Sequence, residues 1–220
     1  MFEVIRWQAV APVRATLAAL ARQTAWHEEG QLVGHPQRTE ALMRAVLRAW
    51  ARERPLPPDA AWWPLTMLVH DVGKLRLPAE LFRKPGPLTA AERALIETHT
   101  TLGAEECARL AEEAEDAEAA AFWRLAEQVA GGHHERPDGQ GYPQGLAGGA
   151  VPLLLRVARA VDVFDALTHH RAYHAARSPA EALAVMETEA GFDTTVLAVL
   201  RRVVAAGAGR PRRTGQQEEA

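Results

Sequence analysis

Two segments of this chain carry residue types that bind metal ions. The first is the dipeptide His70-Asp71, and the second is the pair of adjacent histidines His133-His134. Neutral imidazoles and carboxylates are common ligands of manganese, iron and zinc. A distant His-Asp pair combined with adjacent imidazoles therefore predicts metal chemistry.

His70 and Asp71 close the apolar run 65–69, so we expect both at the inner end of a buried helix. Successive helical positions point about 100° apart, which suits one residue binding a single ion and the other bridging two. Gly73 permits a close backbone approach, and Lys74 brings a cation to the place where an anionic phosphate would bind. A buried His-Asp hydrogen bond that ends a helix is the alternative interpretation of the pair alone.

The chain after His133 and His134 is predicted to leave a helix and turn sharply. Gly139 and Gly141 tolerate positive φ, and Pro143 cannot continue a helix. The ordered chemistry of this turn favours a role beyond that of a linker.

The elements that must position these residues are predicted to be helices. The chain has 220 residues, of which 48% are hydrophobic, enough for one core. Apolar residues recur three and four positions apart in 41–50, 104–110 and 180–186. Residues 1 to about 22 also have the pattern of an amphipathic helix. We therefore predict an all-α fold.

Composition limits the classes of partner. The net charge is −3 and no basic stripe stands out, which argues against a nucleic-acid polymer. The single cysteine, Cys107, excludes a disulfide framework, and no signal-like segment is present. No apolar run reaches the roughly 20 residues that span a bilayer. These features predict a cytoplasmic protein without membrane attachment.

Several segments in order resemble the HD-GYP domain, a branch of the HD metal-dependent phosphohydrolases. They are HDVGKLRLP from His70, LFRKPGPLT from Leu81, HTTLGAE from His99, HHERPDGQGYPQGLAG from His133, VARAVDVFDALTHHRAY from Val157 and GFD from Gly191. The resemblance runs from about Gly34 to about Leu200. It implies an HD-domain helical bundle around a metal site and divides the chain into a helical extension (1–30), the HD-GYP domain (31–205) and a disordered tail (206–220).

The resemblance also implies the metal ligands. Asp162 lies in an apolar helical segment, where an unpaired carboxylate would be costly. Asp165, one turn later, is the competing candidate and is expected to lie outside the ligand set. Gln31 stands where some members have a third-site Glu, so we expect a dinuclear centre bridged by Asp71. Iron or manganese is the first expectation, with zinc and nickel as alternatives. The predicted ligands are His35, His70, Asp71, His99, His133, His134 and Asp162.

The resemblance also implies which residues contact the substrate. Lys74 is expected to stabilise a phosphate oxygen, and Arg171 and Tyr173 resemble substrate-phosphate and base contacts. His174 stands where the family has Lys or Arg, which predicts weaker or pH-dependent phosphate binding. Tyr142, in the loop Gly141-Tyr142-Pro143, is expected at the rim of the site. That loop either contacts a protein partner or only braces the histidine pair.

The function implied is a phosphodiesterase in which a metal-activated water opens cyclic di-GMP to linear pGpG, with pGpG and GMP both left open as the end product. Asp71 and Lys74 are the expected catalytic residues. Two alternatives stay open: a non-hydrolytic module that binds metal or cyclic dinucleotide, and an HD hydrolase of another nucleotide. Retention of all seven ligands favours the enzyme. The N-terminal helix is expected either to cap the core or to form a homodimer.

Overall fold

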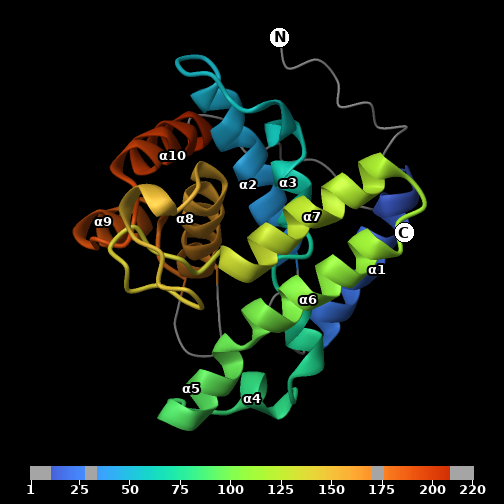
Figure 1. The fold of residues 1–220 in the computed structure, drawn as a ribbon. Helices are drawn as coiled ribbons and strands as arrows, with labels where there is room; N and C mark the ends of the chain where they lie inside the picture. Colours follow the sequence, from blue (N-terminus) through green and yellow to red (C-terminus); the bar gives the residue numbers. More distant parts are fainter. Residues whose placement is uncertain (1–10, 28–33, 170–175, 209–220) are drawn as a thin grey trace, which may run out of the picture.

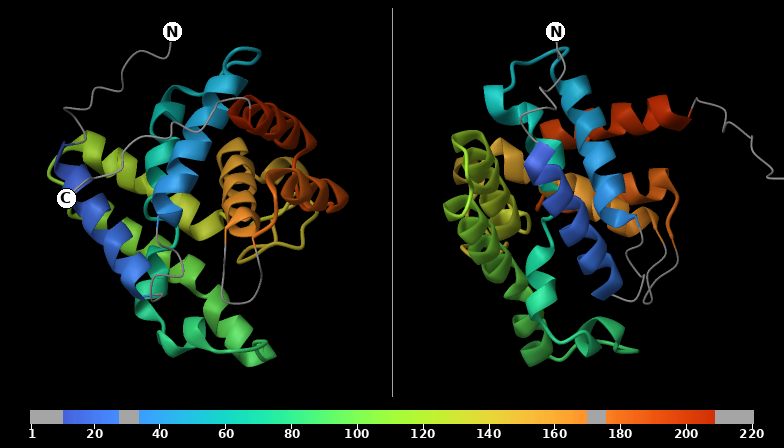
Figure 2. Two further views of the ribbon diagram at one scale, coloured as in Figure 1. Left: turned by 180° about the vertical axis from the view of Figure 1, so that it is seen from behind. Right: turned by 90° about the vertical axis from the view of Figure 1, so that its right-hand side faces the viewer.

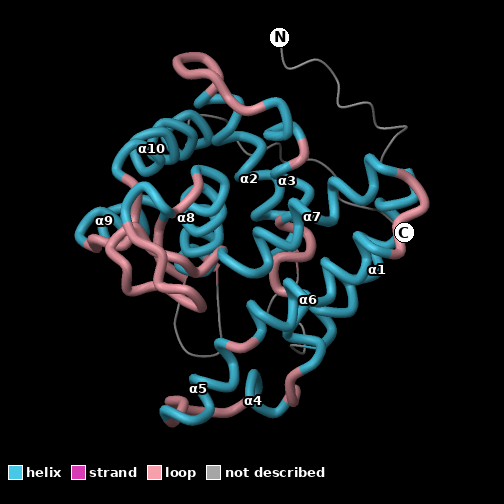
Figure 3. Tube along the Cα trace, in the orientation of Figure 1, coloured by secondary structure: helices cyan, strands magenta, loops and turns pink. Residues whose placement is uncertain are grey.

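The computed structural model describes residues 11–27, 34–169 and 176–208 (Figure 1). Within these ranges the chain forms helices joined by turns and loops, with no β-strand (Figure 3), which confirms the all-α prediction. The α-helices are α1 (Ala11–His27), α2 (His35–Trp50), α3 (Trp63–Thr66), α4 (Glu80–Arg83), α5 (Ala90–Glu97), α6 (His99–Glu112), α7 (Ala117–Gly132), α8 (Leu153–Thr168), α9 (Pro179–Thr188) and α10 (Thr194–Ala208). The 3-10 helices are η1 (Pro58–Ala61), η2 (Val72–Arg76) and η3 (Gly148–Ala150).

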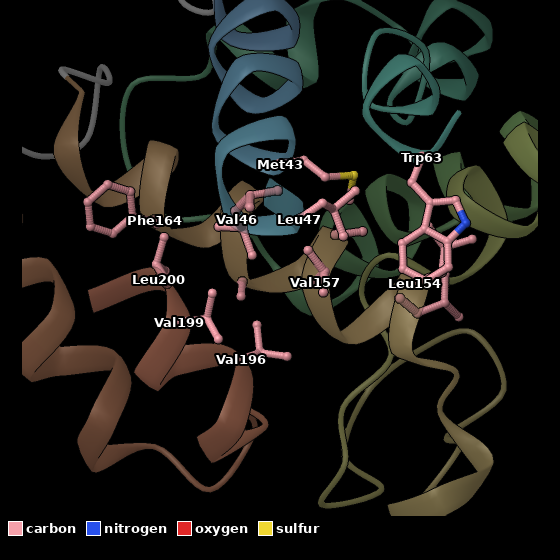
Figure 4. Close-up of a cluster of buried hydrophobic side chains, with 14 of the residues drawn as sticks. Met43, Val46, Leu47, Trp63, Leu154, Val157, Phe164, Val196, Val199 and Leu200 are labelled. Atoms are coloured by element: carbon pink, nitrogen blue, oxygen red, sulfur yellow. The ribbon is translucent and has the colours of Figure 1, made fainter. Parts of the chain in front are cut away.

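The first of two hydrophobic cores lies among α2, α3, α8, α9 and α10 (Figure 4). On α2 the side chains of Met43, Val46, Leu47 and Trp50 are buried, the three- and four-residue spacing that places apolar groups on one helical face. α8 is buried over most of its circumference, as expected for a helix covered on several sides. α10 packs against α2 and α8 (Figure 2).

The second core lies among α1, η2, α6 and α7. α6 and α7 form a helical hairpin with buried Cys107 and Phe122 on its inner side. α1 adds Val13 and Leu17, which are 3% and 1% exposed. The N-terminal helix therefore contributes directly to the core. Within the described residues α1 covers Ala11–His27, so it continues past the predicted end near Arg22; residues 1–10 lie outside the described part.

Several helices begin at polar caps that satisfy the first free backbone N–H groups. Thr89 and Glu92 form a capping box at α5, and Ser178 and Glu181 form one at α9. The Asp116 carboxylate accepts from the Ala119 N–H at the start of α7.

The prediction that the His-Asp pair ends a buried helix was wrong in detail. α3 covers only Trp63–Thr66, and a series of i→i+3 hydrogen bonds leads from it into η2. The N–H of Val69 bonds to the Thr66 carbonyl at 3.1 Å, and that of Val72 to the Val69 carbonyl at 3.0 Å. His70 and Asp71 are buried, as predicted, but they lie on this tightly wound connection.

α10 continues to Ala208, so it includes the first three residues of the segment predicted to lack structure; residues 209–220 lie outside the described ranges. None of the described helices is long and apolar enough to cross a lipid bilayer.

Candidate metal centre

The seven predicted ligands come together between the two cores. His35 begins α2, His70 and Asp71 precede η2, and His99 begins α6. The two histidines 133 and 134 follow α7, and Asp162 lies on α8. Their ligand atoms form overlapping groups in which all atoms lie within 4.8 Å of one another. These groups are Asp71 with His99, His133 and His134; His35 with His70 and Asp71; and His70 with His133 and Asp162.

One end of the centre joins α2, the His-Asp segment and α8. The Nε2 atoms of His35 and His70 are 3.2 Å apart. Asp162 Oδ1 lies 3.3 Å from His35 Nε2 and 3.7 Å from His70 Nε2. Asp162 is thus the carboxylate that faces these imidazoles.

Asp71 lies between the two ends of the centre. Its Oδ2 is 3.4 Å from His70 Nε2, whereas its Oδ1 is 3.4 Å from His99 Nε2 and 3.6 Å from His133 Nε2. The two oxygens of one carboxylate therefore face different groups of imidazoles, which is the arrangement of a bridging ligand.

The hydrogen bonds behind the rings fix which nitrogen faces inward. His70 Nδ1 donates to the Met67 carbonyl at 2.7 Å, and His99 Nδ1 donates to the Ile96 carbonyl at 2.7 Å. His133 Nδ1 donates to the Val129 carbonyl at 3.0 Å. A carbonyl only accepts, so Nδ1 carries the proton of each neutral ring and Nε2 presents a lone pair to the centre.

The distance between two of these nitrogens shows whether the site fits a metal. The Nε2 atoms of His99 and His133 face each other at 3.4 Å, with no proton between them to make a hydrogen bond. Metal–nitrogen bonds of about 2.0–2.1 Å place two ligand nitrogens about 3.0–3.4 Å apart. The residues present therefore fit a divalent ion.

Metal binding needs neutral imidazoles and ionised carboxylates. The surroundings of His99, His134 and Asp71 shift their pKa values in the direction that favours these forms. Burial lowers the pKa of His99 to about 3 against the opposing field of Asp71. Burial, and then the neighbouring His133, hold the pKa of His134 well below its usual value. Burial alone would raise the pKa of Asp71, but Lys74 and His70 outweigh it and keep that pKa low.

His35 differs from the other imidazoles. Burial lowers its pKa, but the hydrogen bonds to Asp162 and Asp165 outweigh burial and raise the pKa to about 9. In the absence of metal a proton thus balances the charge of Asp162, whose own pKa is held well below normal by His35 and His70 despite its burial.

Asp165 orients His35 from behind. Its Oδ2 accepts from His35 Nδ1 at 2.7 Å, while Arg38 donates to both of its oxygens, at 2.7 Å and 2.9 Å. His169 Nδ1 lies 3.1 Å from Asp165 Oδ1. Asp165 thus lies outside the ligand groups. Sequence reasoning missed Arg38, although its position three residues after His35 places both on neighbouring parts of one helix face.

The loop after the histidine pair is held against it by Glu135 and Gly141. The Glu135 side chain is 0% exposed and accepts from the backbone N–H of Gln144 at 2.6 Å and of Leu146 at 2.8 Å. A Cβ on Gly141 would lie 2.4 Å from the Arg136 nitrogen, so only glycine allows this approach. Sequence reasoning gave Glu135 no role, although its place directly after the histidines was a signal.

Tyr142 stacks on His134. The ring centroids are 4.7 Å apart and the planes are 26° apart, and the same tyrosine lies edge-on to His99 at 6.4 Å. His70, His99 and His133 each donate to a backbone carbonyl, but no such hydrogen bond joins the His134 ring to a carbonyl among the described residues. Stacking on Tyr142 therefore orients His134.

We expect Tyr142→Ala to weaken metal binding by the group of Asp71, His99, His133 and His134 by about 10- to 100-fold, the usual effect of losing an orienting partner of a ligand. Tyr142→Phe keeps the stacked ring and is expected to bind metal as wild type does. Metal titration of both variants checks this. Equal affinity in the alanine variant would show that His134 is oriented without the tyrosine.

Lys74 lies beside the Asp71 carboxylate. Its Nζ donates to Asp71 Oδ2 at 2.7 Å, and the side chain is 11% exposed. The Phe82 ring of α4 lies 5.8 Å from Nζ, a cation–π contact that sequence reasoning did not anticipate. The lysine is thus fixed between the metal centre and α4.

The remaining predicted substrate contacts, Arg171, Tyr173 and His174, lie outside the described residues, as does Gln31. They stay predictions.

Comparison with known proteins agrees with this geometry. The family model described as "HD domain" matches residues 16–196. The chain is 32% identical over 173 residues to 3'3'-cGAMP-specific phosphodiesterase 3 of Vibrio cholerae, covering 78% of this chain and 35% of the relative. It is 36% identical over 168 residues to the cyclic di-GMP phosphodiesterase PA4108 of Pseudomonas aeruginosa, covering 74% of this chain and 37% of the relative. The chain thus spans about a third of the length of these curated relatives.

Among solved structures, Bd1817, a HDG"Y"P protein from Bdellovibrio bacteriovorus, superposes with a TM-score of 0.61 at 18% sequence identity. The match covers 80% of this chain and 53% of that one, and it shows a shared fold. The matched residues, the fold and the buried histidine and aspartate groups agree: the chain belongs to the HD domain family.

Proposed function

We propose that this chain is a metal-dependent phosphodiesterase that hydrolyses cyclic di-GMP, using two divalent ions bridged by Asp71. The observation that carries the proposal is the position of Asp71, whose two oxygens face separate groups of imidazoles while Lys74 donates to one of them. The names of the relatives support the class of substrate, since both described above act on cyclic dinucleotides.

Each residue has a distinct role in this proposal. The imidazoles and Asp162 would hold the ions, and Asp71 would serve both of them. Two bound ions would supply Lewis acidity, which lowers the pKa of an attacking water and neutralises phosphodiester charge. Lys74 has three N–H donors, so it can bind Asp71 and a phosphate oxygen together. Arg171, Tyr173 and His174 are proposed to bind the phosphate and base.

The names of three relatives support 3'3'-cGAMP as a second candidate substrate. Three relatives are named 3'3'-cGAMP-specific phosphodiesterases, at 32%, 38% and 37% identity, alongside the cyclic di-GMP phosphodiesterases. Both ligands present the same phosphodiester to the metals and differ in one base, so discrimination must come from base contacts. The described residues around the metals do not distinguish them.

The test is to load the protein with iron or manganese under anaerobic conditions and to incubate it with each dinucleotide separately and with an equal mixture. Chromatography over time should show cyclic di-GMP converted to pGpG and then GMP, faster than 3'3'-cGAMP. Faster loss of 3'3'-cGAMP would reassign the substrate. Tight binding of either without turnover, at full metal content, would instead favour the non-hydrolytic module.

We expect Lys74→Met to keep its metals but to slow hydrolysis by about 10- to 150-fold, equivalent to about 1.5–3 kcal/mol for a charged hydrogen bond. Methionine preserves the apolar stem beside Phe82 while removing the ammonium. Metal content and turnover measured on one preparation check this. Unchanged turnover would show that Lys74 does not act on the substrate.

A further inference from the structure

A groove of about 590 Å³ lies between the C-terminal half of α2 and α10. Arg48 and Arg52 line it on one side and Arg202 on the other. Between the arginines the lining consists of small or β-branched apolar residues, among them Ala45, Ala49, Val203 and Ala206. Its volume falls within the range of about 300–1,000 Å³ that is typical of small-molecule sites.

The charges in this groove are unbalanced. The side chains of Arg48 and Arg52 form no ion pair or hydrogen bond with the residues that the structure describes, although they lie four positions apart, where like charges repel. The one carboxylate in the lining, Glu53, is already engaged by Arg202 at 3.1 Å and by Arg54 at 3.1 Å. The groove therefore carries excess positive charge on a chain whose net charge is −3.

Most arginines elsewhere on the described surface are paired, although Arg22 and Arg93 are exceptions. Arg109 binds Glu106 and Glu113, and Arg201 binds Glu187. Cations are favourable at a helix C-terminus, which accounts for a positive charge at the end of α2. It does not account for a hollow with small apolar residues between two arginine-bearing walls.

A smaller hollow of about 210 Å³ adjoins the groove, because Arg202 lines both. It adds Arg54 and the hydroxyls of Thr194 and Thr195. These groups suit a second phosphate or a sugar.

The groove is separate from the metal centre. Arg48 lies near the opposite end of α2 from His35, about 20 Å along the axis at 1.5 Å per residue. A ligand here would not touch the metal ligands.

We propose that this groove is a second ligand site that binds a phosphate-bearing nucleotide. A guanidinium matches a phosphate with two parallel hydrogen bonds, and it also stacks on planar rings. The small apolar residues between the arginines leave a surface on which a base can lie. Arginines beside an apolar surface fit a nucleotide better than an inorganic anion, because an inorganic anion would use the arginines but not the apolar surface.

The experiment titrates GDP into isotope-labelled protein loaded with diamagnetic zinc and follows backbone amide NMR signals. Those of Ala45, Ala49 and Val203 should shift in a saturable manner, apart from any shifts around the metal centre. Arg48→Ala/Arg52→Ala should weaken the groove response at least about tenfold, as expected for losing two phosphate contacts. Arg22→Ala/Arg93→Ala, which removes two exposed arginines outside the groove, is the matched control and should bind as wild type does.

Other outcomes would overturn the proposal. Shifts confined to the metal centre would show that the groove binds no nucleotide. Equal affinity for guanosine would make the phosphates irrelevant, and equal affinity for pyrophosphate would show an anion site without base contact. Tighter binding of a hexaglutamate peptide than of GDP would identify a protein-docking surface instead.

Discussion

Asp71→Ala is expected to strip the metals from the protein and to reduce hydrolysis by at least about 10³-fold. Asp71 is the one ligand whose oxygens face both groups of imidazoles, so its loss affects each ion. The lost charge stabilisation amounts to several kcal/mol, and each 1.36 kcal/mol is a factor of ten in rate. Metal analysis and turnover on the same sample measure both effects.

The matched control is Asp59→Ala, which removes an exposed carboxylate from η1. It should keep its metals and its activity. Full metal content in Asp71→Ala would contradict the bridging assignment, whatever its turnover.

Gly73→Ala is expected to lower the free energy of unfolding by about 3 kcal/mol or more, at the upper end of the range for overpacking. A Cβ at this position would lie 2.0 Å from the His99 carbonyl oxygen and 2.4 Å from the Gly103 nitrogen. Both are backbone atoms of α6, so relief requires η2 and α6 to separate. The same movement draws Asp71 away from His99, and we therefore expect metal binding to weaken as well.

Gly149→Ala is the control for this substitution, because nothing lies within 4 Å of a Cβ built there. Urea denaturation of both variants should show a large loss for Gly73→Ala and little change for Gly149→Ala. Equal stability would mean that η2 and α6 do not approach as closely as described.

Much of the fold was predictable because the spacing of apolar residues along the sequence shows which face of a helix is buried. The spacing of Met43, Val46, Leu47 and Trp50 predicts the buried face of α2, and the structure buries these residues. The winding around His70 was not predictable in the same way. An apolar run of five residues fits an α-helix or tighter turns equally well, and packing between the two cores selects the tighter form.

The candidate ligands were found because their residue types and motifs are visible in the chain. The contacts behind them were not predicted, because they form only through tertiary packing. Asp165 and Arg38 lie on α8 and α2, far apart in sequence. Phe82 reaches Lys74 only because α4 folds back over η2. Neither contact leaves a repeating pattern of residues in the sequence from which it could be predicted.

The central claim is that two ions lie on either side of Asp71. A crystal structure of the protein as isolated, with anomalous data collected at the metal absorption edges, tests it most directly. We expect two peaks about 3.5–4 Å apart, one beside His35, His70 and Asp162, the other beside His99, His133 and His134. A third strong peak would contradict the interpretation of Gln31, and a single peak, or peaks that do not contact Asp71, would contradict the account as a whole.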